Sequence, residues 1–119
     1  MAYESLFLGS LVLTAALECF AAVVLKKTAG RRLDIKCGYG RLLVVVTLAS
    51  ALTLPYVWFV LPAFIPKGAA YIICSELFAF AVEAAWYTIS LEINIKSAAM
   101  LSAAANAFSF ILGLIIIHQ

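Results

Sequence analysis

Four long apolar runs, separated by short polar or turn-forming segments, set the pattern of this chain. They cover residues 6–25, 42–64, 69–90 and 97–117, approximately. A helix needs roughly 20 consecutive apolar residues to cross the hydrocarbon core of a bilayer, and each run is about that long. The pattern predicts an all-α protein, with residues 1–119 forming one integral membrane bundle of four transmembrane helices.

The breaks in the pattern predict how the helices are joined. The first run ends at Lys26 and Lys27, where a basic loop over residues 26–41 begins. Pro55 interrupts the second run, and a proline inside a helix removes a backbone donor and can kink it. The short connector after this run makes the second and third helices a tight antiparallel pair.

Composition agrees with the hydrophobic pattern and excludes several classes of protein. Hydrophobic residues make up 66% of the chain, and the mean hydropathy is +1.13, whereas soluble domains contain about 45–50% apolar residues. The three cysteines are widely spaced, so neither a disulfide framework nor a zinc site is expected. Because no HExxH or GxSxG motif occurs, we expect no enzyme and no cofactor. We also expect no nucleic-acid partner, because the basic segment has no accompanying fold.

Basic residues are distributed unequally between the two sides of the predicted bundle. The 26–41 loop and the turn after the third run hold seven basic residues, and only Lys67 lies on the opposite side. Since cytoplasmic loops carry an excess of Lys and Arg, we expect a multi-pass protein of the cell membrane with both termini extracytoplasmic. The basic loop has two interpretations: a segment that sets orientation at the headgroups, which we favour, or a binding site for anionic lipid or a partner.

Three carboxylates lie within the apolar runs. Glu76 and Glu83 are seven residues apart, so a helix would point them to the same side, two turns from each other. Glu18 follows Ser10 and Thr14 at intervals of four, which makes one polar stripe along the first helix. Carboxylates in hydrocarbon are costly, and they usually face a bundle interior or a wet cavity.

Depth along the helices predicts which polar residues meet. The fourth run carries a stripe of small and polar residues that includes Asn106. At about 1.5 Å per residue, Glu18, Glu83 and Asn106 fall within one or two turns of one level near the midplane. Glu76 lies nearer the outer surface. We therefore predict a polar pocket made by Glu18, Glu83 and Asn106, with Glu76 on an outward path.

The predicted pocket has two chemical interpretations. Two neighbouring carboxylates in a low dielectric cannot easily both be charged, so at least one should hold a proton at neutral pH. No basic residue lies in any run, which favours a proton or an external organic or metal cation as the counter-charge. Alternatively, the same groups hold helices together by hydrogen bonds worth about 0.6–2 kcal/mol each. Tyr87 either hydrogen-bonds Glu83 from one turn below or belongs to an inner aromatic belt.

Short motifs resemble small multidrug resistance exporters, which are also four-helix proteins of about this length. Glu18, Lys26 and Gly30 are similar to that family's membrane glutamate, span-ending lysine and following glycine. The string I-P-x-G-x-A-Y-x-I-x-S from Ile65 to Ser75 resembles its third-helix entrance. This resemblance implies that Glu18 binds protons and cations and that Tyr71 lines the cavity. Cys74 stands where the family has a tryptophan.

A second resemblance covers more of the chain. The motifs are T-L-P-x-x-W-F-x-x-P in the second run, S-E-x-x-A-x-x-x-E-A in the third and S-x-x-x-N-x-x-S-x-x-x-G in the fourth. They are similar to small prokaryotic four-helix membrane proteins without an assigned function. This resemblance implies a fold and supplies no mechanism.

Two functions follow as hypotheses. The first is a transporter, or a transporter subunit, that uses the buried carboxylates to bind protons or cations. A bundle of this size would need to form a homo-oligomer or join another membrane protein to enclose a path. The second is an accessory or scaffolding protein whose polar helix faces bind partner helices or lipids of the bilayer.

Overall fold

A computed structural model describes residues 2–117 of the chain, and this part is helical with no strand. The helices are α1 (Ala2–Leu33), α2 (Tyr39–Pro55), α3 (Leu61–Phe64), α4 (Ala69–Ser90) and α5 (Ile95–Ile117). A π-helical segment, Tyr56–Val60, joins α2 to α3 in one continuous rod. Four helical segments are long and apolar enough to cross a membrane: α1, the α2–α3 rod, α4 and α5. The all-α prediction is confirmed, and the chain has the helices of a multi-pass membrane protein.

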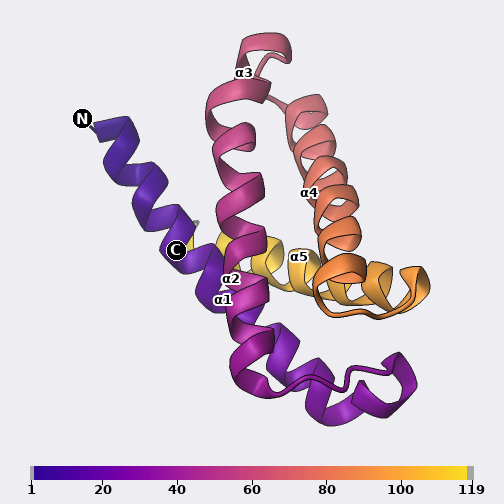
Figure 1. Ribbon diagram of the computed structural model, residues 1–119. Helices are drawn as coiled ribbons and strands as arrows, with labels where there is room; N and C mark the ends of the chain where they lie inside the picture. Colours follow the sequence, from indigo (N-terminus) through magenta and orange to yellow (C-terminus); the bar gives the residue numbers. More distant parts are fainter. Residues whose placement is uncertain (1, 118–119) are drawn as a thin grey trace.

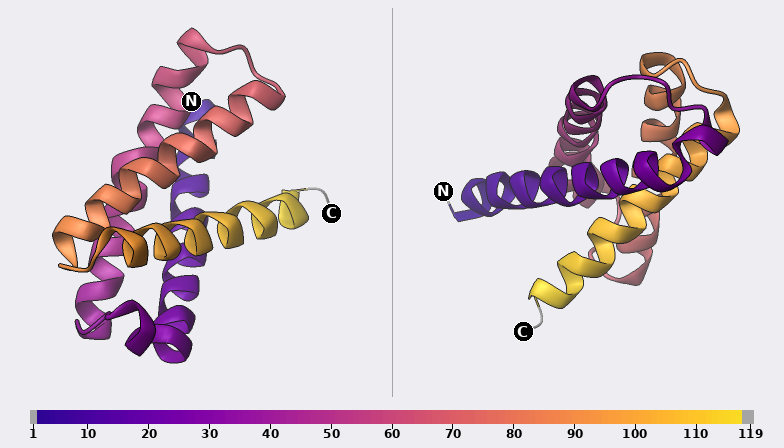
Figure 2. Two further views of the ribbon diagram at one scale, coloured as in Figure 1. Left: turned by 90° about the vertical axis from the view of Figure 1, so that its right-hand side faces the viewer. Right: turned by 90° about the horizontal axis from the view of Figure 1, so that it is seen from below.

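The four long helices pack in a ring. Helix α1 packs against α2 and α5, and α4 packs against the same two helices. In Figure 1, α2 and α4 run side by side while α5 passes behind them. Figure 2 shows that α5 crosses α1 and α4 at a steep angle. Each long helix therefore presents one side to a common interior.

The expected basic loop is shorter than the sequence predicted. Helix α1 continues past Lys26 and Lys27 to Leu33, so residues 34–38 alone separate it from α2. Lys and Arg are good helix formers, and the positively charged run is therefore helical. The change in direction comes at Ala29, whose φ of −133° and ψ of 15° are not helical. The prediction of a loop from residue 26 was wrong because a run of basic residues does not by itself end a helix.

A hydrogen-bonded C-terminal cap ends α1. Asp34 has a left-handed φ of 59°. Its N–H donates to the Arg31 carbonyl at 3.3 Å, and the Ile35 N–H donates to the Gly30 carbonyl at 2.9 Å. These two bonds are those of a Schellman motif, in which the left-handed position is usually glycine. The cap turns the chain back over the end of α1 and fixes the position of Ile35.

The interruption at Pro55 takes the form of the π-helical segment. This segment is held by two tyrosines from neighbouring helices. The Tyr71 hydroxyl of α4 donates to the Val57 carbonyl, and the Tyr3 hydroxyl of α1 donates to the Trp58 carbonyl. Short π-helical segments widen the backbone locally and are frequent at functional sites. Here the segment anchors α1 and α4 at the end of the bundle opposite the basic residues (its outer end).

The close-packed core lies toward the basic end of the bundle. Side chains of all four long helices are fully buried there, among them Ala22, Val46, Tyr87 and Leu101. The α4–α5 turn belongs to the same end, where the Asn94 side chain accepts a hydrogen bond from the Ser97 N–H and begins α5. Large hydrophobic side chains on the outer helix faces are exposed, as a lipid environment requires.

Candidate functional site

Two buried carboxylates lie at the centre of the ring. Glu18 of α1 and Glu83 of α4 are each 1% exposed. Glu18 accepts hydrogen bonds from Ser50 at 2.8 Å and from Ser109 at 3.2 Å, one on each oxygen. Because Ser50 belongs to α2 and Ser109 to α5, this one carboxylate connects three helices.

Glu83 is held in the same way by α2 and α5. Its Oε2 accepts from the Thr53 hydroxyl at 2.9 Å, and its Oε1 accepts from the Asn106 amide at 2.8 Å. The Asn106 amide also donates to the Ser102 carbonyl at 2.9 Å. The structure thus brings the three predicted residues Glu18, Glu83 and Asn106 to one level, with Ser109 next to both Glu18 and the Asn106 carbonyl.

Two hydroxyl groups at this site have alternative acceptors. Thr53 Oγ1 lies 2.9 Å from Glu83 Oε2 and 3.1 Å from the Ala49 carbonyl. Ser109 Oγ lies 3.2 Å from Glu18 Oε2 and 3.2 Å from the Asn106 carbonyl. A hydroxyl has one proton to donate and can also accept. When it donates to the carbonyl, the neighbouring carboxyl group can donate its own proton to the hydroxyl oxygen. The same positions of the heavy atoms therefore suit each glutamate with or without a proton.

Positive side chains are absent from this site. In residues 2–117, the ion pairs are Lys36 with Asp34 and Arg41 with Glu92, both at the basic end. Over the same residues, no group of three or more His, Cys, Asp or Glu side chains is placed to hold a metal ion. Among the residues that line the cavity beside Glu18 and Glu83, none is basic.

A cavity of about 230 Å³ extends from the carboxylates toward the outer end of the bundle. Glu18, Glu83, Asn106 and Glu76 all line it, as do Ser10, Thr14 and Gly113 of the predicted stripes. Glu76 is half-buried and has no hydrogen-bond or ion-pair partner in the described chain. The assignment of Glu76 to an outward path stays a prediction.

A second cavity of about 370 Å³ continues the first one outward. The two share five lining residues: Val57, Trp58, Ser75, Glu76 and Phe110. Tyr3, Lys67, Tyr71 and Ile72 complete the wall of the outer cavity. The Ser75 hydroxyl is buried between the two and has no partner in the described residues. Together the two cavities lead from the outer end toward Glu18 and Glu83 along a wall that is mostly apolar and carries a few polar side chains.

The inner side of the carboxylate pair is close-packed. Ala22, Val46, Ala49 and Leu101 are completely buried on that side, and none of them lines the cavity that contains Glu18 and Glu83. Tyr87, one turn below Glu83, is also completely buried, and its hydroxyl has no partner within residues 2–117. The suggested hydrogen bond from Tyr87 to Glu83 is therefore wrong, and the ring serves as part of the close-packed inner half.

The Tyr87 hydroxyl gives a stability prediction. Leaving a buried donor unsatisfied costs about 1–3 kcal/mol, so Tyr87→Phe should raise the free energy of unfolding by about 1 kcal/mol. Denaturant unfolding in detergent micelles measures the change. Thr88→Val is the control. The Thr88 hydroxyl donates to the Ala84 carbonyl at 2.8 Å, so its removal relieves no unsatisfied donor and should not stabilise the protein. A less stable Tyr87→Phe protein would show that the hydroxyl is bonded after all.

Sequence reasoning missed three residues at this site. Ser50 donates to Glu18 and Thr53 donates to Glu83, and Ser75 lies between the two cavities. A signal for the first two exists, since they are three residues apart on the one polar face of the second run. Hydroxyls in helices often bond their own backbone, which makes such a signal weak.

Comparisons of the chain with protein-family models, with curated proteins and with solved structures found no match.

Proposed function

We propose that this protein is a small membrane carrier, or one subunit of a carrier, in which Glu18 and Glu83 bind protons in exchange for a cation. The observation that carries the proposal is the meeting of two buried carboxylates, without a basic partner, at the inner end of an outward cavity. Ionisable groups inside membranes commonly mark ion and proton pathways.

The hydrogen bonds around the carboxylates support proton exchange. Thr53 and Ser109 each have a backbone carbonyl as a second acceptor. Gain or loss of a proton then needs only a rotation of a hydroxyl group, with no movement of the helices. A cation arriving through the outer cavity would meet Glu76 first and the pair Glu18 and Glu83 last. In this proposal both termini and the cavity mouth face the extracytoplasmic side, and the basic end faces the cytoplasm.

An exchange assay in proteoliposomes tests the proposal. Vesicles hold a trapped pH indicator, and Na⁺, K⁺ or methylammonium is added outside as the probe cation. We expect at least one of the three probes to drive protons out of protein-containing vesicles faster than out of protein-free vesicles. Proton movement equal to that of protein-free vesicles with all three probes would refute a proton–cation carrier for these ions.

A labelling experiment tests the side from which the cavity opens. A Cβ added to Gly113 meets no atom within 4 Å, and Gly113 lines the inner cavity. In a chain whose three cysteines are replaced by serine, Gly113→Cys should react with a membrane-impermeant thiol reagent added outside. Ala105→Cys, on the same helix but completely buried, should stay unmodified. Reaction of Gly113→Cys from the cytoplasmic side alone would reverse the proposed orientation.

The second candidate is a structural role within a membrane assembly, and one observation favours it. Each of the four carboxylate oxygens of Glu18 and Glu83 already has a donor inside the same chain. Such a network could join the helices of a scaffold without transporting anything. It predicts that glutamine in place of either glutamate leaves every measured function unchanged.

A further inference from the structure

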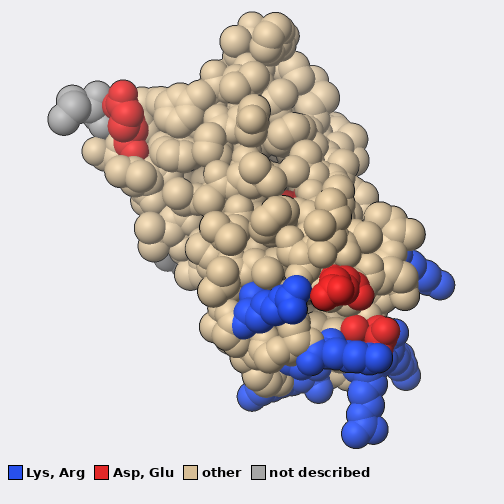
Figure 3. Space-filling model, in the orientation of Figure 1, with Lys and Arg blue, Asp and Glu red and all other residues tan. Residues whose placement is uncertain are grey.

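The basic end of the bundle contains a cavity separate from the carboxylate site. On the face shown in Figure 3, the Lys and Arg side chains gather at the end that holds the α1–α2 loop and the α4–α5 turn. A cavity of about 290 Å³ lies there, lined by residues of the α1 cap. Its lining residues are Lys26, Gly30, Arg31, Asp34, Ile35 and Lys36. The lining has two more positive than negative charges, which favours an anion.

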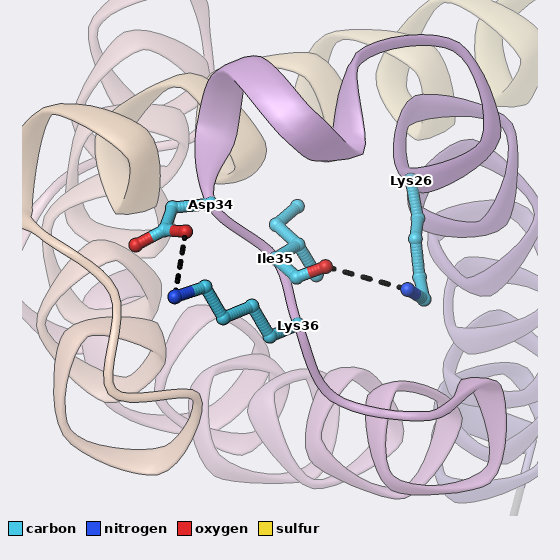
Figure 4. Close-up of polar contacts among 4 residues, drawn as sticks. All are labelled: Lys26, Asp34, Ile35 and Lys36. Carbon is cyan, nitrogen blue, oxygen red and sulfur yellow. Dashed lines mark hydrogen bonds and ion pairs between the residues drawn. The ribbon is translucent and has the colours of Figure 1, made fainter.

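Lys26 is held in a fixed position at this cavity. Its ammonium group donates to the Ile35 carbonyl at 3.3 Å and lies 5.0 Å from the centre of the Tyr39 ring. Figure 4 shows Lys26 reaching across to Ile35 while Lys36 turns toward Asp34 on the other side of the loop. A Cβ at Gly30 would lie 3.5 Å from Lys26 Cγ, so the stem of Lys26 rests close on the helix. One wall of the cavity is thereby preorganised.

The other two cations are available to a ligand. Arg31 is exposed, and its side chain makes no hydrogen bond or ion pair in the described chain. Lys36 lies 3.4 Å from Asp34, but the two side chains are 84% and 58% exposed. Exposed pairs of this kind contribute little energy, so Lys36 can turn to a better anion at small cost. Arg31 and Lys36 are therefore the two groups that an entering phosphate would engage.

An apolar groove lies on α2, beginning one helix turn after Tyr39. Leu43, Val44, Thr47 and Leu48 line a groove of about 260 Å³ on the outer face of α2. Tyr39, Leu43 and Thr47 are four residues apart and share one helix face, which runs about 12 Å from the Lys26–Tyr39 contact into the bilayer. These groove residues are all exposed. Tyr39, whose ring holds Lys26 at the cavity, thus lies one helix turn before the first groove residue, Leu43.

We propose that this end of the protein binds one anionic phospholipid. Its phosphate occupies the cavity between Lys26, Arg31 and Lys36, and one acyl chain follows the groove past Leu43 and Thr47. Charge selects an anionic headgroup, because the lining carries excess positive charge next to a single acid. The groove selects a lipid over free phosphate, because a soluble anion gains nothing from an exposed apolar face one helix turn beyond Tyr39. The site is independent of the proposed carrier activity.

Native mass spectrometry of the detergent-purified protein tests the site. The probes are phosphatidylglycerol and phosphatidylcholine with identical acyl chains, and we expect phosphatidylglycerol to bind more tightly. Removing a charge with Arg31→Gln or Lys36→Gln should weaken phosphatidylglycerol binding by roughly fivefold each. Lys27→Gln and Arg32→Gln are matched controls, since these residues lie on the same helix end outside the cavity lining. Equal weakening by the controls would show attraction to general surface charge and overturn the site.

Two further variants separate the parts of the proposal. Asp34→Asn removes the opposing charge and keeps a residue that tolerates a left-handed conformation. This variant should tighten phosphatidylglycerol binding a few-fold, and a weaker affinity would contradict the proposed cavity.

Thr47→Trp fills the groove and should weaken phosphatidylglycerol binding. Unchanged affinity in Thr47→Trp, or displacement of the lipid by millimolar inorganic phosphate or glycerol phosphate, would show a phosphate site without an acyl groove. Either result would overturn the lipid proposal.

Discussion

Replacing Glu83 by glutamine is expected to reduce cation-driven proton movement to the rate of protein-free vesicles, while the protein remains folded. The glutamine cannot take up or release the exchanged proton. Its oxygen still accepts from Asn106, and its NH₂ group can donate to Thr53, whose hydroxyl then bonds the Ala49 carbonyl. The variant therefore removes the titrating group without leaving a buried polar atom unpaired.

Glu18→Gln should behave in the same way. Ser50 still donates to the remaining oxygen, and the new NH₂ group faces Ser109, which has the Asn106 carbonyl as its other acceptor. Glu92→Gln is the control, because the Glu92 side chain is 79% exposed at the basic end. Proton flux and unfolding are measured on the same preparations. Wild-type flux in both glutamine variants would end the carrier proposal and favour the structural role.

The second large effect concerns the closed inner half. Leu101 is completely buried there, and truncation of a buried leucine to alanine costs about 2–5 kcal/mol through lost contacts and the cavity that remains. Leu101→Ala should therefore lower the free energy of unfolding by that amount. It also opens space below the carboxylates, so we expect passive proton leak through the variant. Leu8→Ala, whose side chain is 59% exposed on α1, should change neither quantity.

Two measurements decide the outcome for Leu101→Ala. Unfolding in detergent reports the packing energy, and dissipation of a pH gradient in vesicles reports the leak. Loss of stability with no increase in leak would mean that neighbouring side chains fill the space left by the substitution. The inner half would then not control the access of protons to the carboxylates. In that case the barrier below Glu83 would have to lie elsewhere.

The sequence was sufficient for the architecture and for the level at which the carboxylates meet. Run length and apolar content set the four spans, and a rise of about 1.5 Å per residue placed Glu18, Glu83 and Asn106 together. Partners across helices were not predictable, because helix rotation depends on packing between neighbours. Ser50 and Thr53 therefore became visible as carboxylate donors only in the structure. The unpaired Tyr87 hydroxyl is a result of the same packing.

Helix ends were predicted less well than helix centres. The sequence marked Lys26 as a boundary, yet α1 continues to Leu33 and ends in a cap at Asp34. Charge reports where a chain leaves the hydrocarbon, whereas a helix stops where its last carbonyl groups find other donors. Pro55 shows the same limit, because two tyrosine hydroxyls support the widened backbone that follows it.

The steep crossing of α5 has a consequence for the membrane around the protein. Helix α5 has 23 residues and a length of about 35 Å, little more than the thickness of the hydrocarbon core. Since it crosses α1 and α4 steeply (Figure 2), these helices cannot all stand upright in one bilayer. In a bilayer, the strongly tilted ones would span less thickness than their length allows, and the lipid beside them would have to thin to match. Membrane thickness should accordingly influence where this protein resides and how it associates.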